Sequence, residues 1–288
     1  MSDDAPPTEA AGTPELRRLT TYPVKSLDPQ DHDSLAVAHG TLAGDREYAM
    51  VAKPADEPHD PTTASVGGRG AYVNGKRTAA VHRLRSSVDR TAGTVTLREQ
   101  DGEESRTFSL DDPGALNAYL TDYFDEPVSI RHEPRGGYPD DREYDGPTVV
   151  STATLREVAS WFDVSTDSAR RRFRANLELG GVPAFWEDRL YADHGEAVAV
   201  RIGDVELLGL NPCRRCVVPS RDPDTGRETP GFRETFLRER QRTRPEWLDS
   251  DRFEGDFRLM VNTRIPESEW GKTLTVGDTV RVLGTRQL

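Results

Sequence analysis

The chain has 288 residues and a formal net charge of −12, and 34% of its residues are hydrophobic. This length builds one large domain or two of ordinary size. No apolar run approaches the roughly 18 residues of a membrane-spanning helix, and the bulk acidity argues against nonspecific binding of nucleic acid. We therefore expect a globular protein whose partners include neither a membrane nor a nucleic acid.

The amino-terminal sequence and the scarcity of lysine indicate the cellular location and the source of the protein. Residues 1–14 are acidic and rich in proline and alanine, and they lack the basic and apolar regions of a secretory signal. They predict a disordered acidic tail on a cytoplasmic protein. The only lysines are Lys25, Lys53, Lys76 and Lys272. An acidic, lysine-poor surface stays hydrated at high salt, which indicates a halophilic source, although a GC-rich genome would also favour arginine.

Short strands dominate the first half of the chain. Turn signals separate them at the spacing of a small barrel or sandwich. The strand-like runs are 15–23, 34–38, 44–52, 79–84, 94–98, 107–110 and 128–131. Residues 53–70 predict a mobile loop. Residues 111–124 predict a helix that Asp111 or Asp112 caps, with an apolar stripe at Leu116, Tyr119, Leu120 and Phe124.

The second half begins after a polar, glycine- and proline-rich segment at 133–146, where we expect a domain boundary. Strands are predicted at 173–179 and 257–261, and hairpins at 198–208 and 273–283. Amphipathic helices are predicted at 151–162 and 232–240. Both halves are therefore mostly β with a few helices, and the fold class expected is mainly β (α+β).

Three groups of polar residues are candidates for binding an anion. Lys25 and Ser26 follow the first strand and suit a phosphate, although a solvated lysine is the plainer interpretation. Ser151 and Thr152 begin a helix, where hydroxyls bind anions or simply cap the helix. Arg174 and Asn176 share one face of the predicted strand at 173–179, which suits a phosphate or a heteroaromatic edge. A salt-bridged strand face is the alternative.

Both cysteines lie in Cys213-Arg-Arg-Cys216. A structural disulfide is not expected in a cytoplasmic protein. The spacing is compatible with half a zinc site, a redox dithiol, or one ligand beside a bystander. No second cysteine pair and no close histidine spacing accompany it, which argues against zinc. The run Val217-Val-Pro219 is a poor opening for a helix and argues against a thioredoxin-like motif, so the single-ligand interpretation is favoured while the dithiol stays open.

Several motifs occur together in one order. They are Tyr22-Pro-Val-Lys-Ser26, Gly44-Asp-Arg46, Phe173-Arg-Ala-Asn176, Ala184-Phe185 with Glu187-Asp188, Ile202-Gly-Asp204, Cys213-x-x-Cys216 with Asp222-Pro-Asp-Thr-Gly226, and Val276-Gly-Asp278. From about residue 15 onward the chain resembles the MOSC proteins with an N-terminal MOSC-associated β-barrel domain, which include the mitochondrial amidoxime-reducing component. The resemblance implies two β-barrel-type domains, at 15–132 and 133–288, with a cofactor cleft between them.

The resemblance further implies the molybdenum cofactor, a molybdopterin, with Cys216 as the metal ligand and Cys213 as its neighbour. Soft thiolates suit such metals, and Arg214 and Arg215 favour the thiolate. The remaining implied cofactor-binding residues are Lys25, Ser26, Arg46, Arg174 and Asn176, with Ser151 and Thr152 as weaker candidates. Asp222 would shape the open side of the metal in a catalytic role.

The activity implied is that of a molybdenum-dependent oxidoreductase that reduces N-hydroxylated compounds or N/S-oxides. The chain lacks cysteines for an iron–sulfur cluster, so a separate ferredoxin-like or cytochrome-like protein would supply electrons. Two alternatives are a sulfur or cofactor carrier that acts with a cysteine desulfurase, and a binding module without turnover. Residues 54–78 are longer than in many relatives and Leu27 replaces a frequent cysteine, so that wall of the pocket departs from the family pattern.

Overall fold

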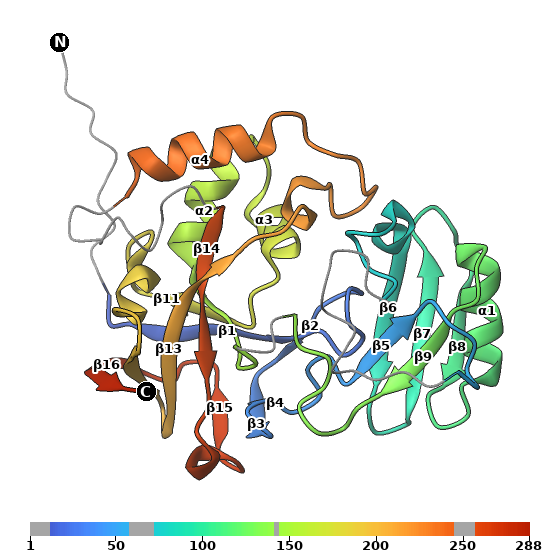
Figure 1. The fold of residues 1–288 in the computed structure, drawn as a ribbon, viewed down its shortest axis with the longest axis horizontal. Helices are drawn as coiled ribbons and strands as arrows, with labels where there is room; N and C mark the ends of the chain where they lie inside the picture. Colours follow the sequence, from blue (N-terminus) through green and yellow to red (C-terminus); the bar gives the residue numbers. More distant parts are fainter. Residues whose placement is uncertain (1–11, 58–71, 141–143, 245–256) are drawn as a thin grey trace.

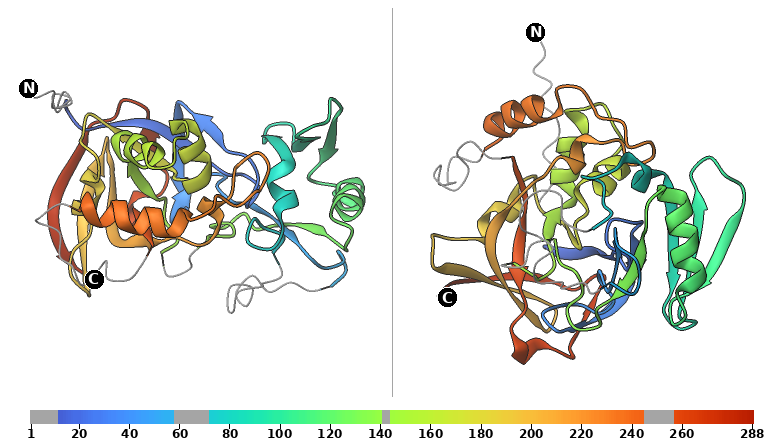
Figure 2. Two further views of the ribbon diagram at one scale, coloured as in Figure 1. Left: turned by 90° about the horizontal axis from the view of Figure 1, so that it is seen from above. Right: turned by 45° about the vertical axis from the view of Figure 1, so that its right-hand side comes forward.

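The computed structural model describes residues 12–57, 72–140, 144–244 and 257–288. It contains a larger lobe, in which one curled sheet is covered by three helices, and a smaller lobe of short strands and one helix (Figure 1). The two further views show the same two lobes side by side (Figure 2). None of the helices in these ranges is long and apolar enough to cross a membrane.

The sheet of the larger lobe has eight strands in the order β16-β12-β13-β14-β10-β11-β1-β2. All neighbours are antiparallel except β10 and β11. The strands are β1 (Glu15–Thr21), β2 (Gln30–His32), β10 (Val149–Ser151), β11 (Leu177–Gly180), β12 (Glu196–Ile202), β13 (Val205–Arg214), β14 (Arg258–Arg264) and β16 (Val280–Gln287). A bridge between Glu15 and Thr279 joins β1 to the turn before β16, so the sheet curls back on itself.

Three helices, α2 (Thr152–Ser160), α3 (Thr166–Phe173) and α4 (Phe232–Arg242), lie together above the sheet (Figure 1). Their apolar faces meet in an aromatic cluster, which includes Phe173, Phe232, Phe236 and Phe257. The ring centroids of Phe236 and Phe257 lie 4.4 Å apart. Buried aromatic contacts of this kind contribute beyond their area, and they fix the end of α3 against β14.

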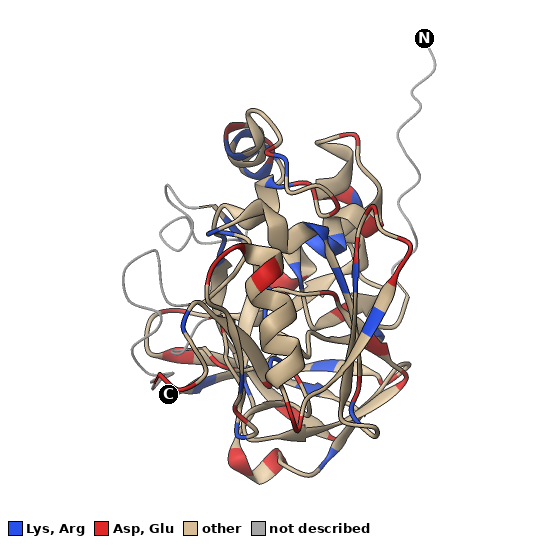
Figure 3. Cartoon of the chain, turned by 90° about the vertical axis from the view of Figure 1, so that its right-hand side faces the viewer, with Lys and Arg blue, Asp and Glu red and all other residues tan. Residues whose placement is uncertain are grey.

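The smaller lobe encloses a second apolar core, formed by Met50, Leu84, Leu97, Leu116 and Leu120 among others. Its elements are β5 (Tyr48–Val51), β6 (Leu84–Asp89), β7 (Thr94–Glu99), β8 (Ser105–Ser109), α1 (Gly114–Phe124) and β9 (Ser129–His132). Strands β6, β7 and β8 form one antiparallel sheet, and β5 pairs with β9. A third small sheet joins β3 (Ser34–Ala38), β4 (Thr41–Leu42) and β15 (Thr273–Thr275) below the lobes. Acidic and basic residues are interspersed along the ribbon (Figure 3).

The mainly β (α+β) class predicted from the sequence is confirmed, although no sheet of the described residues closes into a complete barrel ladder. The strands predicted near 15–23, 34–38 and 94–98 and the apolar stripe of α1 are found as expected. The predicted boundary at 132/133 stays a prediction, since β1 and β2 of the first half lie in the sheet of the larger lobe. Residues 1–11 of the predicted tail and 58–70 of the predicted loop lie outside the described residues.

Four local predictions outside the segment 173–179 are wrong. Residues 79–83 form a 3-10 helix, η1 (Ala79–Arg83), because Thr78 caps the backbone N–H of Ala80. Pro113 lies at the start of α1, where no side chain caps the helix. Only 48–51 of the segment 44–52 is a strand, since its beginning turns through left-handed residues. The predicted hairpin at 273–283 does not form, because β15 pairs with β3 and β16 pairs with β12.

A buried charged cluster ties the turn η2 (Trp186–Leu190) to α2 and α4. Thr154 Oγ1 on α2 donates to Glu187 Oε2 at 3.0 Å, and Arg240 on α4 forms an ion pair with Asp188. Glu187 is only 1% exposed. Burial, and next the neighbouring Asp188 carboxylate, raise the pKa of Glu187 to about 7.

This raised pKa predicts a pH-dependent stability. Unfolded Glu187 loses its proton near pH 4.5 and folded Glu187 near 7, so its contribution to the free energy of unfolding falls as pH rises between them. We expect Glu187→Gln to gain stability relative to the wild type by up to about 3 kcal/mol over this interval, at about 1.4 kcal/mol per pKa unit. Urea unfolding from pH 4.5 to 8 measures it. Glu234→Gln, at an exposed position on α4, is the control; a pH-independent difference for Glu187→Gln would contradict the prediction.

Candidate functional site

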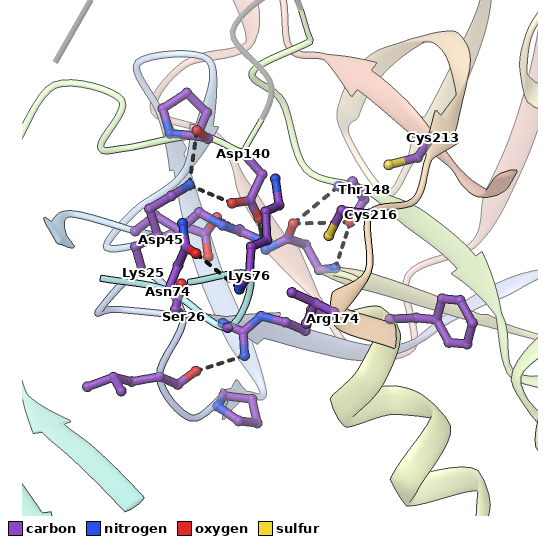
Figure 4. Close-up of a pocket in the computed structure, with 18 of the residues that line it drawn as sticks. Lys25, Ser26, Asp45, Asn74, Lys76, Asp140, Thr148, Arg174, Cys213 and Cys216 are labelled. Carbon is purple, nitrogen blue, oxygen red and sulfur yellow. Dashed lines mark hydrogen bonds and ion pairs between the residues drawn. The ribbon is translucent and has the colours of Figure 1, made fainter. Parts of the chain in front are cut away.

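A cavity of about 270 Å³ is lined by residues of both lobes. Its polar lining from the first 82 residues is Lys25, Ser26, Asp28, Thr41, Asp45, Arg46, Tyr72, Asn74, Lys76 and His82. From the rest of the chain come Arg85, Asp140, Asp145, Thr148, Arg171, Arg174, Asn176, Cys213, Arg214, Arg215, Cys216 and Asn262, among others. Figure 4 shows many of these side chains converging on one space. The structure therefore brings together most of the site residues predicted from the sequence.

Hydrogen bonds between Tyr22, the residue after β1, and the turn at 44–47 place Lys25 near Arg46. The N–H of Tyr22 donates to Asp45 Oδ1 at 2.8 Å, and the N–H of Arg46 donates to the carbonyl of Tyr22 at 3.0 Å. Ser26 and Arg46 have φ values of 75° and 52°. Such left-handed backbone is costly for residues other than glycine and persists where the surroundings impose it. Here two segments more than 20 residues apart hold one another in place.

Lys25 and Arg46 face the carboxylate of Asp140. Nζ of Lys25 donates to Asp140 Oδ1 at 2.5 Å, and Nη2 of Arg46 lies 3.3 Å from Oδ2. The deep position of Asp140 alone would raise its pKa, but Lys25 and Arg46 hold the pKa well below its usual range. Burial lowers the pKa of Lys25. Burial also opposes the charge of Arg46, but Asp45 and Asp140 outweigh it and raise the pKa of Arg46. Arg46 and Asp140 thus stabilise one another's charged forms, whereas burial opposes the charge of Lys25.

Tyr22 joins this cluster to Arg174. The guanidinium carbons of Arg174 and Arg46 lie 4.0 and 5.0 Å from the centroid of the Tyr22 ring. Tyr22 donates its hydroxyl to the carbonyl of Ala175 at 3.1 Å, and burial raises its pKa to about 12. A buried ring attracts cations on its face, which compensates part of the repulsion between two arginines. Nη1 of Arg174 donates to the carbonyl of Leu27 at 2.9 Å, and burial lowers the pKa of Arg174.

The predicted strand at 173–179 is wrong in its first part. Phe173 ends α3, and Arg174 is the left-handed cap of that helix with φ of 58°; the strand begins at Leu177. Arg174 and Asn176 nevertheless both line the cavity. The amide of Asn176 donates to the carbonyl of Thr20 at 3.1 Å and accepts from the N–H of Thr148 at 3.2 Å. Asn176 therefore fixes the wall of the cavity by holding β1 next to β10.

The two cysteines differ in their surroundings, although both are free thiols that line the cavity. Cys213 packs against the aromatic cluster, and Arg215 Nη1 donates to its Sγ at 3.1 Å. The sulfur of Cys216, just beyond the end of β13, forms no hydrogen bond within the described residues. In Figure 4 it points towards the polar side chains of the cavity, whereas Cys213 lies at the edge. Arg215, predicted to favour the Cys216 thiolate, is bonded instead to Cys213 and to the carbonyl of Phe173.

Residues 147–281 match the sequence model of the MOSC domain family. The chain contains a MOSC domain. This family is associated with the molybdenum cofactor. The chain is also similar to a solved structure, the YUAD protein from Bacillus subtilis, at 12% identity and a TM-score of 0.37, covering 94% of this chain and 95% of that chain. No curated protein matches the chain.

The matched MOSC range holds Arg174, Asn176 and Cys216, whereas Lys25 and Arg46 precede it. The cavity is therefore made jointly by the MOSC domain and the segments before it. Among the described residues, no group of three or more His, Cys, Asp or Glu side chains is arranged to hold a metal ion.

Three predicted site residues of the MOSC domain lie outside the cavity lining. Ser151 caps α2 by accepting from the N–H of Thr154 at 3.0 Å, which is the alternative to anion binding that the sequence offered. Thr152 donates to Glu178 at 2.8 Å. Asp222 accepts from the N–H and the hydroxyl of Thr225, both at 2.9 Å, and thereby closes its own turn. These contacts give all three residues structural roles in this conformation.

Several residues of the cavity lining were not identified from the sequence, among them Lys76, His82 and Asp140. Tyr22, whose ring lies against Arg174 beside the cavity, was not identified either. Tyr22 lies within the motif that drew attention to Lys25, so its signal was present. Burial, and next Arg174 and Arg221, lower the pKa of His82 to about 4, so the imidazole is neutral at neutral pH. Its Nε2 is buried without a hydrogen-bond partner among the described residues. No motif or local pattern in the sequence indicates that His82 or Asp140 lines the cavity.

The position of Tyr22 between two arginines predicts an effect on stability. Tyr22→Phe keeps the ring and loses one hydrogen bond, which costs about 1 kcal/mol. Tyr22→Leu also loses the ring faces that the two guanidinium groups contact, and we expect a loss of about 2–4 kcal/mol. Urea unfolding of both variants measures the difference. Equal losses would show that the ring contributes nothing to holding the arginines.

Proposed function

We propose that the protein binds a molybdenum cofactor, a pterin dithiolene with one phosphate, and reduces N-hydroxylated or N/S-oxide small molecules. The observation that carries the proposal is the convergence of Cys216 with Lys25, Ser26, Arg46 and Arg174 on one cavity. A single open thiol and a group of buried cations are what a metal and a phosphate in one ligand require. The association of the MOSC family with this cofactor supports it.

The donor set fits the cofactor at its metal end. A thiolate is a soft ligand that suits a redox-active metal, and Cys216 has no competing hydrogen bond among the described residues. Cys213 is engaged by Arg215 and by apolar packing. We therefore assign Cys216 as the metal ligand and Cys213 as a supporting neighbour.

The phosphate end also fits. Arg46 Nε and Arg174 Nη2 are buried without hydrogen-bond partners among the described residues. Buried donors without partners are costly, so a ligand that supplies acceptors would stabilise both side chains. The cavity volume of about 270 Å³ lies just below the roughly 300–1,000 Å³ typical of ligand sites. Lys25, Arg46 and Arg174 would hold the phosphate, and Ser26 and Asn176 would contact the pterin.

The cofactor, when bound, supplies the two-electron redox chemistry by which oxygen is removed from the substrate. The protein's part is to position ligands and to control charge. Neutral His82 offers one hydrogen bond to a substrate without adding charge to a cavity already rich in cations. A side chain at Gly75 would place its Cβ 2.6 Å from His82 Nε2, so glycine lets the backbone approach the imidazole. A separate ferredoxin-like or cytochrome-like protein in the cytoplasm would deliver the electrons.

A sulfur carrier is the second candidate function, and the open thiol of Cys216 is the observation that favours it. In that role Cys216 would hold a persulfide received from a cysteine desulfurase. Mass spectrometry of the metal-free protein distinguishes the two, because a labile adduct of one sulfur atom on Cys216 is expected only for the carrier.

Metal analysis combined with detection of the pterin phosphate tests the main proposal on protein expressed in its native host. We expect one molybdenum and one pterin phosphate per chain. We expect Cys216→Ser to lose the metal and the reduction of a test amidoxime by a chemical electron donor, and Cys213→Ser to keep both. Wild-type protein without molybdenum would refute the function. Full activity in Cys216→Ser would refute the ligand assignment alone.

A further inference from the structure

The ammonium group of Lys25 has no donor left for a ligand. Nζ donates to the carbonyls of Tyr138 and Pro139 at 3.0 and 3.2 Å and to the carboxylate of Asp140 at 2.5 Å. A lysine ammonium has three donors, so all of them are used. An anion can bind Lys25 directly only if one of these three acceptors leaves.

Both terminal nitrogens of Arg46 are engaged by carboxylates, and only its Nε lacks a partner among the described residues. Its Nη1 donates to Asp45, and its Nη2 forms the ion pair with Asp140. Asp45 also accepts from the N–H of Tyr22, and its side chain is only 5% exposed. Asp45 is therefore a fixed part of the wall, and Asp140 occupies the position from which an anion would contact Nη2 of Arg46 and Nζ of Lys25 together.

Asp140 is the partner of both cations that is free to leave. Its side chain is 64% exposed and lines the cavity. The other acceptors of Lys25 are backbone carbonyls, and that of Arg46 is buried. Because water reaches the Asp140 carboxylate, this side chain can leave both cations and be hydrated, which a backbone carbonyl or the buried Asp45 cannot do.

We propose that Asp140 is an internal anion that occupies the subsite formed by Lys25 and Arg46 in the free protein, and that a ligand's phosphate takes its place. The two cations and the carboxylates of Asp45 and Asp140 sum to zero formal charge. A phosphate monoester carries a charge of about −1.5 to −2 at neutral pH and offers three acceptor oxygens. It can therefore contact both Lys25 and Arg46 in place of Asp140, and it brings more negative charge to them than one carboxylate does. A small monoanion gains no charge over Asp140, which is already tethered at the subsite. Asp140 thus selects phosphate over monoanions.

This inference rests on the proposed function only where it names the cofactor's phosphate as the natural occupant. Inorganic phosphate is therefore the probe, titrated into the metal-free full chain by calorimetry and by thermal unfolding. We expect Asp140→Asn to bind phosphate about 10-fold or more tightly than the wild type, because the competing carboxylate is removed. We also expect Asp140→Asn, unlike the wild type, to be stabilised by formate. Unfolding in the absence of phosphate confirms that each variant folds.

Asp145→Asn is the matched control, because Asp145 lines the same cavity and is exposed but contacts neither Lys25 nor Arg46. We expect its phosphate affinity to stay within about 2-fold of the wild type, because its exposed carboxylate pairs with neither cation and its charge is screened by water and salt. An equal gain in phosphate affinity in both variants would mean that removing any negative charge from the cavity strengthens binding. That result would overturn the proposal that phosphate displaces Asp140.

Unchanged or weaker phosphate binding by Asp140→Asn would instead make Asp140 a support for Lys25 and Arg46, and would overturn the proposal. The same holds if phosphate stabilises none of the proteins. Lys25→Met is expected to lose phosphate binding in the Asp140→Asn background. Absence of molybdenum from native protein would refute the cofactor function and leave these phosphate measurements unaffected.

Discussion

The site depends on the contact between Tyr22 and two arginines from distant parts of the chain. The Tyr22 backbone binds Asp45 and Arg46, its hydroxyl reaches Ala175, and its ring contacts the guanidinium groups of Arg46 and Arg174. Burying several cations together is costly unless they are paired. The aromatic face and the carboxylates of Asp45 and Asp140 lower that cost. One residue after β1 thereby positions charges supplied by segments more than 100 residues apart.

The loop after the cysteines has a supporting role that its sequence does not reveal. Asp222 closes a turn with Thr225, and this turn presents the carbonyl of Pro223 to Arg85 of the smaller lobe and to Arg171 of α3. Pro223 itself lines the cavity. The segment that follows Cys216 therefore joins the two lobes across the cavity. Asp222 acts on the site through the position of this turn, and its own carboxylate is occupied by turn hydrogen bonds.

The elements that the sequence predicts well are those whose pattern is local. Strands β3 and β7 alternate clearly, and α1 carries an apolar stripe, whereas β1 alternates only in part because of a bulge between Leu16 and Arg18. The segment 168–179 is ambiguous because its apolar residues satisfy a strand period after Phe173 and a helix period before it. There tertiary packing decides, since Phe173 enters the aromatic cluster as the last residue of α3. The partners of β15 and β16 are likewise chosen by long-range pairing. The site was predictable where residues form compact motifs, as Lys25, Arg46, Arg174 and Cys216 do.

The segment 133–146 shows why the rest of the site was not predictable. Its glycines and polar residues have the composition of a linker. In the structure Gly137 has a φ of 64°, and a Cβ there would lie 2.6 Å from the carbonyl oxygen of Arg46. The N–H of Tyr138 then donates to that same carbonyl at 2.8 Å. Glycine is required here for close approach of two backbones, which carries Asp140 onto Lys25 and Arg46. Composition alone cannot distinguish a glycine that loosens a chain from one that lets it enter a site, because the difference lies in what the backbone approaches.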